Sequence, residues 1–176
     1  MSQPHADENT LQKDSVRRLA SSLGAITALV ESVTEDSSVW TASPDQWCLR
    51  EIIGHLIDGD REIFRLRMEM AFSGSLEDWP AMDPEEWVTE RKYSERSLRE
   101  LLRLFQDERQ RSLAWLAGLD DPDWFLERDL PDGPLKAGDL LMAWCTHDSL
   151  HLEQIARWCT AKALQDHDHF TDDFAF

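Results

Sequence analysis

Basic residues are scarce in this sequence. Its 176 residues include 18 Lys and Arg against 35 Asp and Glu, which gives a formal net charge of −17 at pH 7. A protein that binds the phosphates of nucleic acid needs a basic face, and anionic membrane surfaces repel a chain of this charge. We therefore expect neither nucleic acid nor a membrane as a partner.

Cysteines and long apolar runs are also few. Cys48, Cys145 and Cys159 are an odd set without C-x-x-C spacing, which argues against a disulfide framework and predicts buried thiols in a reducing compartment. No stretch approaches the ~18–20 apolar residues of a membrane span. The first eight residues lack the basic and apolar segments of a signal peptide. These absences predict a cytoplasmic protein.

What the sequence does have is helical periodicity. Apolar residues recur every three or four positions in four stretches, which predict helices at about residues 10–33, 44–72, 94–118 and 137–163. Ser43, Pro44 and Gln46 are typical of the N-cap of the second helix, and its charged residues, Asp58 and Asp60 included, are assigned to the outer face. The inward stripe of this helix is drawn through Ile52, His55, Leu56, Gly59, Ile63, Leu66 and Met70. No strand is predicted.

The connection between the second and third helices, residues 73–93, is long for a compact domain. Helices of this length form a bundle roughly 35–40 Å long, which an extended chain of about 20 residues can span. The length therefore favours parallel second and third helices joined by a crossover, with the fourth helix antiparallel to the second. We expect one all-α domain over residues 1–176, a four-helix bundle, with tails at 1–9 and 164–176.

Three histidines fall on the inward faces of this bundle. His147 and His151 are four residues apart on the apolar face of the last helix, and His55 lies inward on the second. The parallel arrangement places all three at a similar height. Buried imidazoles need partners, imidazole suits zinc or nickel, and three protein ligands plus water form a catalytic metal site. The sequence predicts a metal site at His55, His147 and His151; the alternative is three core histidines satisfied by protein groups.

A second motif interpretation is the zincin pattern His-Glu-x-x-His. Asp148 stands where that pattern has its Glu, and His167 or His169 would have to supply the third ligand. The lack of strands argues against such a protease. We interpret His167-Asp168-His169 as part of a solvated tail.

The segments Trp47-x7-His55-Leu56-x-Asp58 and Thr146-His147-Asp148-x-x-His151-Leu152-x-Gln154-Ile155 resemble the DinB-like (DinB/YfiT) superfamily. The resemblance implies a four-helix bundle of up-down-down-up topology, with a divalent metal, often nickel or zinc, on the three histidines, and frequently a homodimer. Characterised relatives include thiol-dependent S-transferases and a mycothiol-dependent maleylpyruvate isomerase, and many members are labelled metal-dependent hydrolases. The resemblance therefore implies an enzyme that either transfers a low-molecular-weight thiol to a small molecule or hydrolyses a small molecule. The alternatives are a non-enzymatic metal- or ligand-binding bundle and a dimerising protein whose histidines hold nothing.

The residues around the histidines have predicted roles as well. A metal-bound water or thiolate would be the reactive group, and Glu51, Asp58 and Asp148 are candidate hydrogen-bond partners of the ligand histidines. The topology brings a set of aromatic and basic side chains to the same end: Trp40, Trp47, Trp87, Arg91, Tyr93 and Trp158. Of these, Trp47, Trp87, Arg91 and Tyr93 are the predicted substrate contacts. A cation at Arg91 beside the metal would indicate an anionic substrate.

Overall fold

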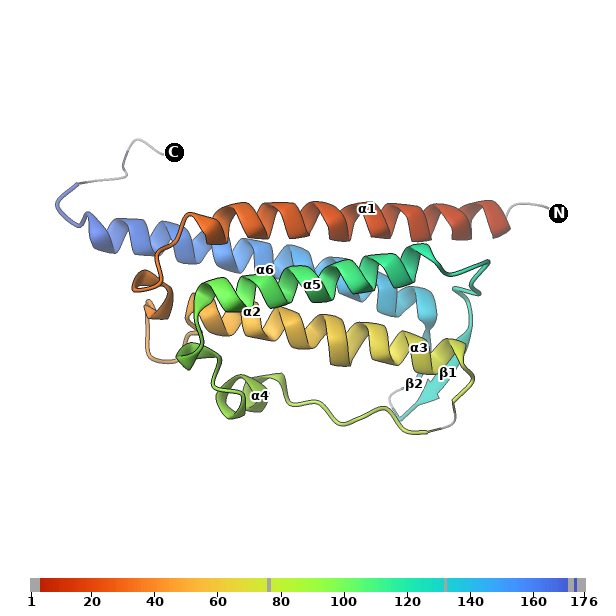
Figure 1. Cartoon of the computed structure of the whole chain (residues 1–176). Helices are drawn as coiled ribbons and strands as arrows, with labels where there is room; N and C mark the ends of the chain where they lie inside the picture. Colours follow the sequence, from red (N-terminus) through yellow and green to blue (C-terminus); the bar gives the residue numbers. More distant parts are fainter. Residues whose placement is uncertain (1–3, 76, 132, 171–172, 174–176) are drawn as a thin grey trace.

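The computed structural model describes residues 4–75, 77–131, 133–170 and 173, with side chains from Thr10 onward, as a bundle of long helices (Figure 1). The bundle has four helical rods. The first is α1 (Pro4–Glu31), the third is α5 (Leu98–Ala117) and the fourth is α6 (Ala137–Asp166). The second rod consists of α2 (Leu49–Asp58), the π-helical segment η2 (Gly59–Arg65) and α3 (Leu66–Phe72), and it is continuous because the residues at both junctions keep right-handed helical angles.

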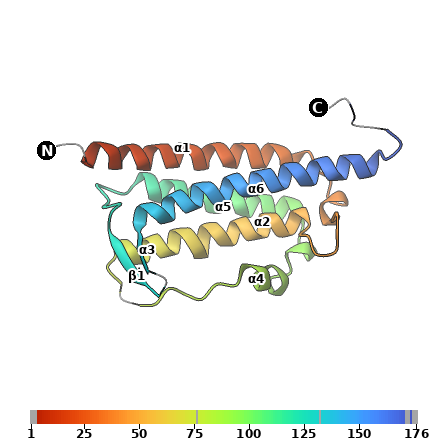
Figure 2. The same ribbon diagram turned by 180° about the vertical axis from the view of Figure 1, so that it is seen from behind.

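Each rod packs on two others. α1 lies against α5 and α6, and α2 also lies against α5 and α6, so the four rods close around a shared core. Figures 1 and 2 show α1 and α6 running in one direction and α2–α3 and α5 in the other. The expectation of an all-α four-helix bundle is confirmed. None of the described helices is both long and apolar enough to cross a bilayer.

The connections contain structure that periodicity did not predict. The crossover carries a short helix, α4 (Pro84–Glu90), and a 3-10 turn, η3 (Tyr93–Glu95); another 3-10 turn, η1 (Ser37–Val39), follows α1. A hairpin precedes α6, formed by the antiparallel strands β1 (Glu127–Leu130) and β2 (Gly133–Lys136). The expectation of no strand was wrong, because four-residue strands are too short to show an alternating pattern.

Two helix starts also differ from the prediction. α1 begins at Pro4, inside the predicted tail, and α2 begins at Leu49 instead of Pro44. The Ser43 hydroxyl donates to the Asp45 carboxylate, so the Ser-Pro signal forms a turn and does not cap the helix. The cap is made instead by the Glu51 carboxylate, which accepts the backbone N–H of Cys48 at 2.8 Å.

The three cysteines are free thiols. Cys48 and Cys145 are buried and Cys159 is half-buried. Burial raises the pKa of Cys48 to about 11, so this thiol stays protonated and inert at neutral pH.

Candidate metal centre

The structure brings together the three histidines that the sequence singled out. One nitrogen of each imidazole lies within 4.8 Å of the corresponding nitrogens of the other two. His147 Nε2 is the central atom, 2.9 Å from His55 Nε2 and 3.1 Å from His151 Nε2. Donor atoms that share a tetrahedral zinc at 2.0–2.1 Å lie roughly 3.3 Å apart. The two distances from His147 Nε2 are therefore close to what one ion requires.

No placement of the imidazole protons gives every ring nitrogen of this cluster a hydrogen-bond partner. His151 Nδ1 donates to Gln154 Oε1 at 2.7 Å, which leaves a lone pair on His151 Nε2. If His55 carries its proton on Nδ1, that N–H is buried with no acceptor among the described residues. If it carries the proton on Nε2 and donates to His147, the lone pairs of His147 and His151 face each other at 3.1 Å. Either tautomer is costly. A cation between the three Nε2 atoms removes the repulsion between the facing lone pairs, and it requires the His55 proton to lie on Nδ1.

The imidazoles are held in the neutral form that a metal needs. Burial, and then the neighbouring His151, lowers the pKa of His55 to about 4. Burial and the other two rings lower the pKa of His147 to about 2, and burial also lowers the pKa of His151. All three can therefore offer lone pairs at neutral pH.

The π-helical segment fixes the position of the His147 ring. Gly59 faces it so closely that a Cβ there would lie 3.2 Å from His147 Cε1. Phe64, in the same segment, meets the ring edge-on at 5.1 Å and stacks on Trp144 at 5.4 Å. η2 thus supplies two of the surfaces that confine one ligand of the cluster.

A buried ion network lies beside the cluster, and the sequence interpretation missed it. Arg109 of α5 is fully buried and donates to both oxygens of Asp60 at 2.7 Å and to both oxygens of Asp148. The indole N–H of Trp144 donates to Asp60 at 2.9 Å, and the Ser22 hydroxyl donates to Asp148 at 2.7 Å. The network joins all four rods next to His147. A lone Arg in a helix rich in charge carries no signal of burial, which is why periodicity did not reveal it.

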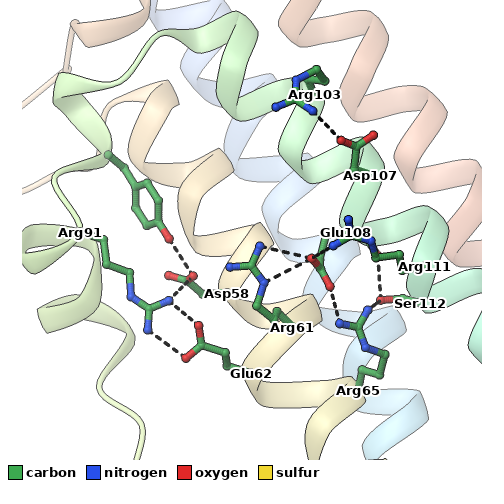
Figure 3. A network of polar contacts seen from close by, with 11 residues as sticks. Asp58, Arg61, Glu62, Arg65, Arg91, Arg103, Asp107, Glu108, Arg111 and Ser112 are labelled. Carbon is green, nitrogen blue, oxygen red and sulfur yellow. Dashed lines mark hydrogen bonds and ion pairs between the residues drawn. The ribbon is translucent and has the colours of Figure 1, made fainter.

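Arg91 is bound by carboxylates, as Figure 3 shows. It donates to Asp58 and to both oxygens of Glu62, at 2.7 and 2.9 Å, and its guanidinium lies 4.5 Å from the Trp87 ring. Tyr93 is buried and donates its hydroxyl to Asp58 at 2.7 Å. These contacts fasten the crossover to α2 and η2. The positive charge of Arg91 is therefore neutralised within the protein.

Figure 3 also shows another buried carboxylate, that of Glu108 on α5. Arg61 donates to it at 3.2 Å, and Arg65 and Arg111 pair with it as well. Arg65 also donates to the Ser112 hydroxyl at 2.9 Å. These ion pairs also join η2 to α5, so two separate groups of ion pairs hold the π-helical segment.

The three carboxylates predicted to assist the ligands have other partners. Glu51 caps α2, and Asp148 binds Arg109 and Ser22. Asp58 is buried, contrary to its assignment to the outer face, and so is Asp60. Desolvation raises the pKa of Asp58 against the opposing effect of Tyr93 and Arg91. Asp58 Oδ2 has no partner among the described side chains, so this carboxylate keeps a buried spare acceptor.

The predicted substrate contacts separate in the structure. Trp47 packs on the His55 ring at 5.0 Å and lines a surface groove next to the cluster. Trp158 lines the same groove, and the Trp40 ring packs edge-on against the Trp158 ring at 5.8 Å. Arg91 and Tyr93 are engaged with Asp58 as described, and Trp87 lies under Arg91. Only Trp47 of the four predicted contacts lines this groove.

The third-ligand candidates of the zincin interpretation lie elsewhere. His167 is the C-cap of α6 and His169 follows it, both exposed. Among the described residues, the single group of metal-ligating side chains close enough to share an ion is the cluster of His55, His147 and His151.

The bundle and its converging imidazoles define a four-helix protein with a three-histidine cluster fit to hold a divalent ion. Over residues 18–155 the sequence matches the family model described as the DinB superfamily, and the chain belongs to that superfamily. The resemblance inferred from the histidine motifs is confirmed. A comparison with curated proteins finds no match.

Two solved structures share the fold. YfiT from Bacillus subtilis, described as "a probable metal-dependent hydrolase with an unusual four-helix bundle topology", is 17% identical with a TM-score of 0.73, covering 84% of this chain and 85% of that one. A point mutant of the mycothiol-dependent maleylpyruvate isomerase is 12% identical with a TM-score of 0.67. That match covers 82% of this chain but 60% of the isomerase. At these identities the likeness concerns the fold.

Proposed function

We propose that this protein is a metal-dependent enzyme that acts on a small molecule, by thiol transfer or by hydrolysis. One observation carries the proposal: three neutral imidazoles converge through their Nε2 atoms, and no arrangement of their protons satisfies them. His55, His147 and His151 would hold a divalent ion, zinc or nickel. The ion would supply a Lewis acid that lowers the pKa of a bound water or thiol.

The protein's own residues prepare this site. Gln154 orients His151 through Nδ1, and the closeness of Gly59 and Phe64 confines His147. Trp47 covers His55 and excludes water from one side of the ring. Asp58 keeps a buried acceptor three residues from His55 on the same helix. The similarity to a protein described as a metal-dependent hydrolase and to a mycothiol-dependent isomerase supports both reaction classes.

Metal analysis of the purified protein tests the site. We expect about one zinc or nickel ion per chain after purification without chelators, and loss of most of that metal in His151→Ala. His169→Ala is the matched control, because His169 is an exposed histidine outside the cluster. Full metal content in His151→Ala would show that the ligand assignment is wrong. A wild-type protein that holds no metal and cannot be reconstituted would support a dimerising protein without a metal.

Enzyme and binder are separated by an activity assay. The metal-loaded protein is incubated with glutathione, cysteine or another low-molecular-weight thiol and an electrophile, and in parallel with an activated ester. Turnover that disappears in His151→Ala supports the enzyme, and stoichiometric metal without turnover favours a metal- or ligand-binding bundle. The homodimer and the cytoplasmic location expected from the sequence stay predictions, to be checked by light scattering and cell fractionation.

A further inference from the structure

A groove of about 630 Å³ opens beside the histidine cluster, where the connection before α2 meets the outer side of α6. Two of its lining residues touch the cluster directly. Trp47 packs on the His55 ring at 5.0 Å, and Gln154 accepts the Nδ1 proton of His151 at 2.7 Å. A molecule that fills the groove would therefore lie next to the ligand rings. The groove is large enough for a small organic ligand.

The walls of the groove are aromatic and apolar. Trp47 and Trp158 contribute indole rings, and Ile52 and Leu150 contribute aliphatic surface. Leu150, on α6, is 60% exposed, so its side chain is accessible to a ligand. Trp158 is held in place by the bond from its indole N–H to the Trp40 carbonyl at 3.0 Å. Rigid indole faces of this kind bind apolar groups, and they attract cations over the ring.

The charges at the rim are mostly negative. Asp45, Glu85 and Glu153 line the groove together with a single cation, Arg157. Arg157 pairs with Glu153 at 2.6 Å, so these two charges offset each other. Asp45 accepts a hydrogen bond from the Ser43 hydroxyl, which lowers its pKa and keeps it ionised. Asp45 and Glu85 therefore make the charge of the groove negative, and the net charge of −17 on the whole chain acts in the same direction.

We infer that the groove binds an organic cation, an amine carried on an aromatic or aliphatic body, as the substrate or thiol used at the histidine cluster. The body would lie between Trp47 and Trp158, and the ammonium group would face Asp45 and Glu85. Arg91 is not free to bind the anionic substrate that it suggested, because Asp58 and Glu62 bind its guanidinium. The link to chemistry rests on the proposed function; the preference for a cation rests on the groove alone.

Two probes of nearly equal shape and opposite charge test this inference. Phenethylamine and 3-phenylpropionate share the phenyl ring and the two-carbon arm, and their binding to zinc-treated protein can be followed by Trp fluorescence and by the indole signals in NMR spectra. At low ionic strength we expect phenethylamine to bind about tenfold more tightly, since two exposed carboxylates each favour the cation and disfavour the anion modestly. The difference should shrink in about 0.5 M salt, because surface charges are screened.

Variants assign the preference to the two carboxylates. The double variant Asp45→Asn/Glu85→Gln should bring the two probes within about twofold of each other. Glu127→Gln/Asp129→Asn removes the same charge from exposed positions on β1 and should keep the preference. Equal or tighter binding of 3-phenylpropionate, no binding of either probe, or an unchanged preference in Asp45→Asn/Glu85→Gln would each overturn the inference.

The outcome is distinct from that of the metal test. In His151→Ala, loss of zinc with the amine preference intact is the result expected if both ideas hold. A wild-type protein that prefers phenethylamine but binds no metal overturns the proposed function and leaves the groove assignment standing. A wild-type protein that binds zinc but does not prefer phenethylamine overturns the groove assignment alone.

Discussion

Replacing Gly54 by alanine should unfasten the crossover from α2. A Cβ at this position would lie 2.2 Å from Tyr93 Cγ and Cδ2, far inside van der Waals contact. Tyr93 is only 3% exposed, so its ring has no free space to move into. We expect the ring to be displaced and its hydroxyl to lose the 2.7 Å bond to Asp58. The carboxylate would then keep Arg91 as its remaining donor.

The size of the effect follows from three contributions. Overpacking a close contact costs about 1–3 kcal/mol, and losing a hydrogen bond to a charged group costs about 1.5–3 kcal/mol. Alanine regains about 1 kcal/mol over glycine inside a helix. We expect the free energy of unfolding to fall by about 3 kcal/mol, measured by urea denaturation followed by circular dichroism.

Gly24→Ala is the matched control, because a Cβ at this position in α1 meets no atom within 4 Å. It should stabilise the protein by about 0.5–1 kcal/mol through helix propensity. Tyr93→Ala removes the ring, and in that background Gly54→Ala should no longer destabilise the protein but should stabilise it by about 0.5–1 kcal/mol, as Gly24→Ala does. If Gly54→Ala stabilised the protein as Gly24→Ala does, or kept its full cost after Tyr93→Ala, the close packing of Tyr93 on Gly54 would be refuted.

Three further predictions concern the buried charges and the cluster. Arg109→Met leaves Asp60 and Asp148 buried without their cation and should lower the free energy of unfolding by about 3–5 kcal/mol at pH 7. Because desolvation raises the pKa of Asp60, the loss should be smaller near pH 5. A loss below 1 kcal/mol at pH 7 would argue against the network. In chelator-treated protein, burial holds the pKa of His55 at about 4, against 6.5 in the unfolded chain, so below pH 6.5 the unfolded state binds the extra proton and stability is lost as the pH falls towards 4, by about 3 kcal/mol for this group. His55→Gln should flatten that part of the stability curve, whereas His169→Gln should not, and equal pH slopes in wild type and His55→Gln would contradict a buried neutral imidazole. Zinc at about 100 times its dissociation constant should raise the free energy of unfolding by about 2.7 kcal/mol, and a melting temperature that zinc leaves unchanged would contradict a site in the folded state.

The histidine cluster could be predicted because its signals are local. His147 and His151 share one helix face by spacing alone, and His55 stands on the inward face of its own helix. The length of the crossover gave the expected helix directions, which placed the three at one height. The groove could not be predicted in the same way, because it depends on the path of the connection before α2. Because of the N-cap signal at Ser43, the helix was predicted to start five residues too early, and this error hid the connection that carries Asp45 and Trp47.

The inward stripe predicted for the second rod is wrong for a different reason, the π-helical segment η2. The same segment links the buried ion network to the histidine cluster. A regular helix would place Leu66 and Met70 inward, but the structure buries Phe64 and Met68, while Leu66 and Met70 are half-buried. A π-helix bonds each residue to the fifth one along, so it takes in extra residues and shifts the inward stripe. Asp60 thus lies inside next to Gly59, which the regular stripe already placed inward.

Asp60 then meets Arg109 and Trp144, and Gly59 meets His147. Periodicity analysis assumes one constant turn and therefore assigns such a carboxylate to solvent. The burial of Asp60 against Arg109 is also a physical reason for the segment to leave the regular helix, because its carboxylate would otherwise leave that arginine half-paired in the core. The irregular turn is thus the feature that joins the buried charges to the confinement of His147.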